Sequence, residues 1–209
     1  MRARREAEIH HLIGGDLCLD FANTLNGHDS PPSHEYLHDY RDLVLWGRHA
    51  GVLSLPVYRE LLKQAETRPS EAEDIFRKTL MLRETIFGIF SALAFQRKPA
   101  EADINQLNKT WQDAQRHTQL ASSSRGFALG WNDEPSLEHI SRRITISAVD
   151  LLTSSEKIKR ICRCSGDHCD WLFVDLSRNH MRRWCSMEEC GNRAKMRRRQ
   201  QRKKLTSSK

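Results

Sequence analysis

The apolar positions in the first three quarters of the chain follow a helical pattern. The stretch "RPSEAEDIFRKTLMLRETIFGIFSALAFQRKP", residues 68–99, holds apolar residues at a spacing that suits one long, buried helix, with Ser70 as its N-cap and Pro99 beyond its end. The same reasoning predicts four more helices, at 40–51, 56–66, 99–115 and 137–152. A short β-hairpin is predicted between Leu120 and Trp131, where Ser, Gly and aromatic residues gather. This part is expected to be mainly α.

The segment "GGDLCLDFANTLNG", residues 14–27, has a pattern that fits two structures. Leu17, Leu19 and Phe21 alternate as in a strand, but Leu17, Phe21 and Leu25 also share one face of a helix. Three polar residues interrupt this apolar run: Asp20, Asn23 and Thr24. Buried polar groups need hydrogen-bond partners. These residues are therefore expected either to cap a helix and fix the N-terminal turn or to line a small-molecule pocket.

Charge and cysteines divide the chain into two parts. Of the 209 residues, those up to residue 154 include 18 Lys and Arg against 21 Asp and Glu, a net charge of −3. Those after residue 154 include 16 against 6, a net charge of +10. Cys18 lies in the first part, and the other five cysteines lie between residues 162 and 190. We therefore expect a domain of residues 1–154 and a small, basic, cysteine-rich domain of residues 155–209.

Four of the cysteines have the spacing of a zinc site. Two C-x4-C pairs, separated by fifteen residues, are formed by Cys164, Cys169, Cys185 and Cys190. Two short loops that each present two thiolates suit the tetrahedral geometry of Zn²⁺, and a reducing compartment disfavours disulfides. The intervening residues suggest a hairpin with strands at 171–175 and 181–184. Cys162 is an alternative to Cys164, and His168 or His180 could replace one thiolate.

A basic segment follows the last of these cysteines. Of the twelve residues 193–204, eight are Lys or Arg and none is acidic. A helix with positive charge on nearly every face is not stabilised by its own side-chain pairs. It needs an N-terminus fixed by the metal site, or a polyanion such as nucleic acid. The alternative, a solvated basic tail, leaves the arginines at 178, 182 and 183 without a role.

The predicted partner of this basic surface is double-stranded DNA. The residues expected to contact it are Arg178, Arg182, Arg183, Asn192, Arg193, Lys195, Arg197, Arg198, Arg199, Arg202 and Lys203. Asn192 and Arg193 lie near the start of the helix, where side chains can approach base edges. The other cations are predicted to contact mainly phosphates, which gives affinity without sequence information.

Two stretches of the chain resemble known families. "CSGDHCDWLFVDLSRNHMRRWCSMEECGNRAKMRRR" is similar to the CGNR zinc finger, which is named after the tetrad found here at positions 190–193. "GGDLCLDFANTLN" is similar to the start of the ABATE domain, which precedes this finger in a bacterial family of stress-induced transcription regulators. The resemblance implies a treble-clef-like finger with Cys164, Cys169, Cys185 and Cys190 as zinc ligands. It also implies that the finger binds DNA and that the ABATE body senses an effector or mediates assembly.

Together these features predict a mainly α (α+β) N-terminal domain, a small zinc finger and a DNA-binding transcription regulator. An RNA-binding protein is the alternative, and a small-molecule effector and a homodimer are further expected partners, since one short finger reads few base pairs. An enzyme is not expected, because a four-thiolate zinc site has no open position for water. No signal peptide is recognised, and Thr85 to Phe95 is too short to span a bilayer. We expect a cytoplasmic, nucleoid-associated protein without a membrane partner.

Overall fold

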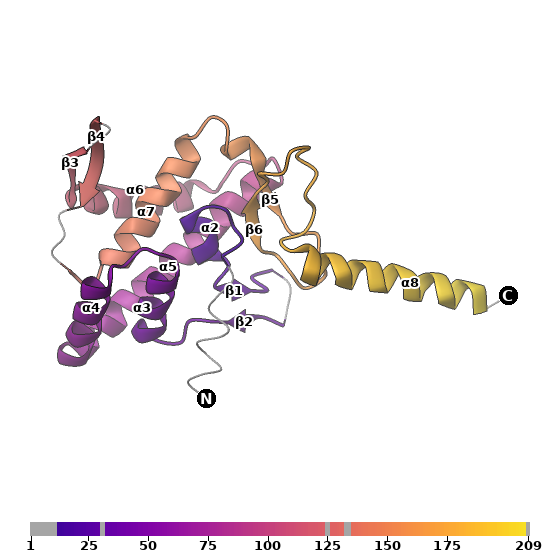
Figure 1. Ribbon diagram of the computed structural model, residues 1–209, viewed down its shortest axis with the longest axis horizontal. Coiled ribbons are helices and arrows are strands. Elements are labelled where there is room, and N and C mark those ends of the chain that lie inside the picture. The colour runs from indigo at the N-terminus through magenta and orange to yellow at the C-terminus, as the bar shows by residue number, and fades with distance from the viewer. Residues whose placement is uncertain (1–11, 30–31, 124–125, 132–134, 208–209) are drawn as a thin grey trace.

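The computed structural model describes residues 12–29, 32–123, 126–131 and 135–207. Its helices form a body from which the last helix projects (Figure 1). The body contains the helices α2 (Leu17–Ala22), α3 (Tyr40–His49), α4 (Leu55–Thr67), α5 (Pro69–Ala94), α6 (Glu101–Gln115) and α7 (His139–Thr153). It also contains two strand pairs: β1 (Leu25–Asn26) pairs with β2 (His34–Glu35), and β3 (Thr118–Ser123) pairs with β4 (Gly126–Trp131). The C-terminal part contains η1 (Ile158–Arg160), β5 (Ile161–Arg163), β6 (Leu172–Val174), η2 (Met187–Gly191) and α8 (Asn192–Ser207). The fold is mainly helical with small sheets, as predicted.

The long helix α5 is the centre of the body, and α2, α3, α4, α6 and α7 all pack against it. Its apolar side chains, among them Ile86, Ile89 and Phe90, are buried. The helix begins at Pro69 with Arg68 as its N-cap, so the predicted N-cap at Ser70 is wrong. Proline suits this first position because its fixed φ is helical and its missing N–H would have no partner there.

The segment with the ambiguous pattern forms the short helix α2. It lies between α5, α7 and β6. Four of its own residues, Cys18, Leu19, Phe21 and Ala22, are buried. The Phe21 ring packs against Trp46 of α3, with ring centroids 5.2 Å apart. A helix that is covered on nearly every side has no polar face, which explains why neither a helical nor a strand period stands out in its sequence.

One of the two predicted hairpins is present, and the other is wrong. β3 and β4 pair antiparallel between Thr118 and Trp131, as predicted. β6, however, pairs with β5 and not with residues 181–184, which form no strand. The second edge of β6 is already occupied, since the Val174 amide donates to the Gly14 carbonyl over 2.8 Å and Leu172 bonds to the Asn23 side chain.

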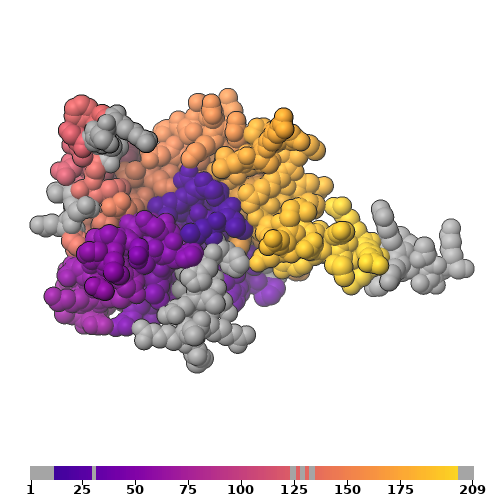
Figure 2. All heavy atoms as spheres, viewed as in Figure 1, coloured from indigo at the N-terminus to yellow at the C-terminus, as the bar shows by residue number. Residues whose placement is uncertain are grey.

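The body and the C-terminal part share one hydrophobic core. Side chains alternate along β6, as in any strand. Leu172 and Val174 join Ile161 of β5 in the core of the body, whereas Trp171 and Phe173 pack in a second cluster with the cysteines. Each fully buried aliphatic side chain contributes about 1.5–3 kcal/mol. The two parts therefore lie directly against each other (Figure 2).

We expect the substitution Asn23→Ala to destabilise the whole protein. The Asn23 amide accepts from the Leu172 N–H over 2.8 Å and donates to the Leu172 carbonyl over 2.9 Å, and both residues are buried. Removal of the amide leaves two backbone groups of β6 without partners, which costs about 2–4 kcal/mol. Chemical denaturation measures this loss. The exposed Asn108→Ala is the matched control, and equal stability of the two variants would contradict the role of Asn23.

Candidate metal centre

Four cysteine sulphurs come together between the two short loops of the C-terminal part. The Sγ atoms of Cys164, Cys169, Cys185 and Cys190 all lie within 4.8 Å of one another. The Cys169–Cys185 and Cys185–Cys190 sulphur distances are 3.7 and 3.5 Å. A tetrahedral zinc ion with bonds of about 2.3 Å holds its sulphurs about 3.8 Å apart. The four thiols thus have the chemistry and the spacing of a closed metal site.

The fifth candidate, Cys162, does not belong to this group of four. It lies on β5 opposite Phe173. Burial raises the pKa of the Cys162 thiol, with the nearby Asp175 carboxylate as a second cause, so this group favours its neutral form. His168 and His180 are also outside the cluster, and both have a left-handed backbone conformation in their loops.

Backbone amides reach the sulphurs both from the first cysteine loop (residues 164–169) and from Cys185. The amides of Gly166 and Cys185 both donate to Cys164 Sγ over 3.3 Å. Such bonds stabilise a thiolate. Position 166 also needs a glycine, because a Cβ there would lie 2.9 Å from Cys190 Sγ. A larger residue would push the loop away from the cluster.

The thiols influence each other's ionisation. Hydrogen bonds from Cys169 and Cys185 lower the pKa of Cys164 to about 7. Hydrogen bonds from the other thiols, Cys164 first, and from the Arg193 guanidinium lower the pKa of Cys190. The same bonds with Cys164 raise the pKa of Cys169 and of Cys185. The cluster without metal therefore retains protons that a bound cation would displace, which makes metal affinity dependent on pH.

The tetrad at 190–193 connects the cluster to α8. Cys190 is the fourth of the five residues of η2, and the Ser186 hydroxyl caps the start of η2 by accepting from the Glu189 amide. Gly191 is buried, and a Cβ at this position would lie 3.0 Å from the Met187 sulphur. The Asn192 side chain donates to the Glu188 carbonyl over 3.0 Å. These contacts fix the direction in which α8 leaves the cluster.

Arg193 and Arg182, both predicted to contact DNA, also form hydrogen bonds within the finger. An Arg193 N–H donates to Cys190 Sγ over 3.0 Å, so this guanidinium contacts the cluster, although the residue as a whole is exposed. Residues three apart in a helix are neighbours, so the spacing of Cys190 and Arg193 could have predicted this contact. The Arg182 guanidinium donates to the carbonyls of Cys185 and Trp184 and lies 4.2 Å above the Phe173 ring. Both guanidinium groups thus form hydrogen bonds with other groups of the finger.

The remaining predicted cations are on the surface, with some differences. Arg197 is paired with Asp167 of the first loop. The side chains of Arg202 and Lys203 lie outside the described residues, although the backbone of both belongs to α8. Exposed positions are occupied by Arg178, Arg183, Lys195, Arg198 and Arg199. The last three show no ion pair among the described residues.

The N-terminal polar residues make structural hydrogen bonds. Asp20 Oδ1 accepts from the Gly14 amide over 2.7 Å, and burial raises the pKa of Asp20 to about 6. Asn23 holds β6, as described above. The Thr24 hydroxyl donates to the Phe21 carbonyl and accepts from Arg83. None of the three lines the cavity of about 330 Å³ found between α5, α6 and α7.

The loop after α2 fixes the first cysteine loop to the body. This role was not predicted from the sequence. The amides of Gly27 and Asp29 each donate over 3.0 Å to the carboxylate of Asp170, which is fully buried. Asn26 donates to the His168 carbonyl over 3.2 Å. Arg163 of β5 binds the Asp29 carboxylate over 2.7 Å. The position of the cluster therefore depends on the body as well as on the cysteines.

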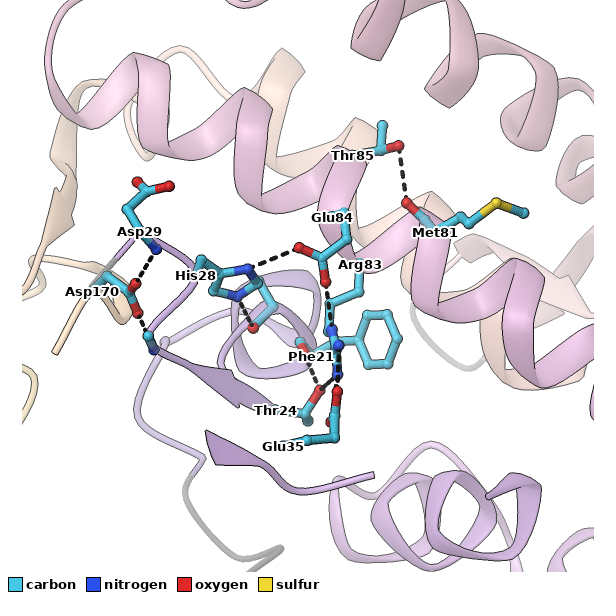
Figure 3. A network of polar contacts seen from close by, with 12 residues as sticks. Phe21, Thr24, His28, Asp29, Glu35, Met81, Arg83, Glu84, Thr85 and Asp170 are labelled. Carbon is cyan, nitrogen blue, oxygen red and sulfur yellow. Dashed lines mark hydrogen bonds and ion pairs between the residues drawn. The ribbon is translucent and has the colours of Figure 1, made fainter. Parts of the chain in front are cut away.

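A polar network under this loop keeps it in place (Figure 3). The Arg83 side chain is only 4% exposed and binds both carboxylate oxygens of Glu35 over 2.6 and 2.7 Å. The His28 ring stacks on Phe87, with centroids 3.6 Å apart, and bonds to Glu84 over 2.9 Å. The Arg83 and His28 side chains are buried, whereas their carboxylate partners Glu35 and Glu84 are 31% and 51% exposed. The network thus positions the groups that bind Asp170.

We expect Gly166→Ala to weaken metal binding. The added methyl group overlaps Cys190 Sγ, and overpacking of this kind costs about 1–3 kcal/mol. Competition between the protein and a chromophoric chelator for Zn²⁺ measures the change. Ser165→Ala, at the neighbouring exposed position, is the control and should retain the original affinity. An unchanged affinity of Gly166→Ala would show that the loop is not tightly packed on the cluster.

Comparisons with known proteins agree with this geometry. Within the described residues, no helix combines the length and apolar character needed to cross a bilayer. No curated protein matches the chain. The model of the CGNR zinc finger matches residues 160–203, and the ABATE model, described as "Putative stress-induced transcription regulator", matches residues 15–155. Since the second match covers more than half of the chain and the first follows it, the chain belongs to the ABATE family and carries a C-terminal CGNR zinc finger.

Proposed function

We propose that this protein is a zinc-dependent, DNA-binding transcription regulator. The observation that carries the proposal is the position of the four-thiol cluster at the start of a projecting basic helix (Figure 1). Four thiolates in a tetrahedral arrangement favour zinc, and a site without an open position serves structure and not catalysis. Zinc would be held by Cys164, Cys169, Cys185 and Cys190, and its binding free energy would stabilise the finger.

The zinc site would fix the start of the basic helix α8. Cys185 lies two residues before the η2 turn, Cys190 lies near its end, and α8 begins directly after it. A site that fixes both ends of this turn also fixes the direction of the helix, which its like-charged side chains could not stabilise by themselves. Phosphates of DNA supply the second stabilising contact, because lysine and arginine release condensed counterions from the duplex when they bind.

Duplex DNA is favoured over single-stranded RNA by the aromatic residues. Readers of single-stranded RNA stack bases on exposed aromatic rings. In this finger Trp171 and Phe173 are buried against the cysteine cluster and are not free for stacking. Trp184 is partly exposed, but the Arg183 guanidinium lies over its ring at 5.6 Å from the centroid.

For the ABATE body we propose the sensing of a small-molecule effector or the assembly of a homodimer, in a cytoplasmic protein that associates with the nucleoid. The cavity between α5, α6 and α7 is the best place for an effector. It has a volume of about 330 Å³, and its wall includes Lys78, Lys109 and Arg142 as well as Asp113 and Glu138, which pair with Arg142. Ligand pockets usually start at about 300 Å³. α7 leads through η1 into β5 of the finger, which gives a bound effector a route to the DNA-binding part.

The proposal predicts about one zinc ion per chain and salt-dependent DNA binding. We expect Cys190→Ser to lose both the zinc and the affinity for a duplex, because the start of α8 is no longer fixed. Cys162→Ser is the matched control, since its thiol lies outside the cluster, and it should keep both. Metal analysis and titrations of duplex DNA, with RNA as competitor, measure these outcomes. Binding that is insensitive to salt, or unchanged without zinc, would refute the proposal.

A further inference from the structure

The helix α8 has two faces with different surroundings. Arg198 and Arg199 follow Lys195 by three and four residues, so both lie next to Lys195 on the same side of the helix. On this side the helix borders a groove of about 480 Å³. A second groove, of about 750 Å³, runs along the other side and is lined in part by Arg193 and Arg197.

The first groove combines an apolar floor with a cationic rim. Its floor is formed by Trp184, Met187 and Gly191, and Met187 is 64% exposed. Its rim carries the three cations of α8, and no acidic residue lines it. Among the described residues, none of these three cations forms an ion pair. The groove thus offers unneutralised positive charge beside a small exposed apolar surface.

The cations of the second groove already have hydrogen-bond or ion-pair partners among neighbouring groups. Arg193 donates to the Cys190 thiol, and Arg197 is paired with Asp167. Glu188 and Glu189 line the same groove. A phosphate placed there would meet carboxylates, and this repulsion offsets the attraction of the arginines.

We propose that the groove of Trp184, Met187, Lys195, Arg198 and Arg199 binds the sugar–phosphate backbone of one strand of duplex DNA, with the Arg193 and Arg197 face turned away from it. The inference rests on the proposed function and specifies its surface. Lysine and arginine on the rim bind phosphates. The apolar floor packs against the less polar faces of the sugars, and Arg183, beside Trp184, extends the cationic edge.

Two neighbouring residues provide a closely matched test. Arg197→Gln and Arg198→Gln remove the same charge from adjacent positions of one helix, and glutamine has a helix propensity similar to that of arginine. We expect Arg198→Gln to flatten the slope of log K against log[salt] on a random duplex by about one unit. Arg197→Gln should leave the slope unchanged, because the carboxylate of Asp167 already balances Arg197. Zinc content, measured in both variants, shows that the finger is intact.

A third variant tests the floor of the groove. Met187→Ala removes exposed apolar surface and no charge. We expect it to weaken binding by the same factor at every salt concentration, with the slope unchanged. Binding equal to that of the original protein would overturn the role of the floor.

The outcomes separate this inference from the function on which it rests. Equal loss of slope in Arg197→Gln and Arg198→Gln, or a larger loss in Arg197→Gln, overturns the assignment of the face while DNA binding stands. An original protein without salt-dependent affinity for the duplex overturns the proposed function itself. Tighter binding of a single-stranded RNA than of the duplex, lost in Arg198→Gln, overturns DNA as the occupant of the groove.

Discussion

The strand β6 is the constraint on which the rest of the structure depends. Its alternating side chains enter two cores, with Leu172 and Val174 in the body and Phe173, together with the preceding Trp171, beside the cysteines. Its two edges are also used, one by β5 and the other by Gly14 and Asn23. A strand that is fixed on both faces and both edges cannot shift its register without exposing apolar groups or breaking hydrogen bonds. The position of the finger on the body follows from this.

This arrangement couples the metal centre to the helical body. Asp170 lies between the first cysteine loop and β6, and its carboxylate binds the amides of Gly27 and Asp29. Any ligand that binds only the folded finger also stabilises these contacts with the body. By the same linkage, a ligand that changes the packing of the body alters the free energy of metal or DNA binding. The boundary near residue 154 is therefore one of composition and charge, whereas the hydrophobic core continues across it.

The sequence predicted those features that depend on local spacing. The helices from Tyr40 to Thr153 and the β3–β4 hairpin follow from apolar period and turn residues. The grouping of four thiols follows from their spacing, since two short loops suffice to bring them together. The pairing of β6 with β5 could not be predicted in the same way. It depends on Asn23, which is 149 residues from Leu172 in the sequence, and on which strand edge the body has already occupied.

Side-chain roles within the basic segment were beyond the sequence for a related reason. Composition treats the eight Lys and Arg residues between 193 and 204 as equivalent, but the electrostatic free energy of each depends on its nearest anionic group. Arg193 is three residues from a thiol whose pKa it helps to lower. Arg197 meets Asp167 of the first cysteine loop, which is 30 residues away in the sequence. The folded finger thus divides one uniform run of positive charge into cations that bond to the cysteine loops and cations without an ion pair among the described residues.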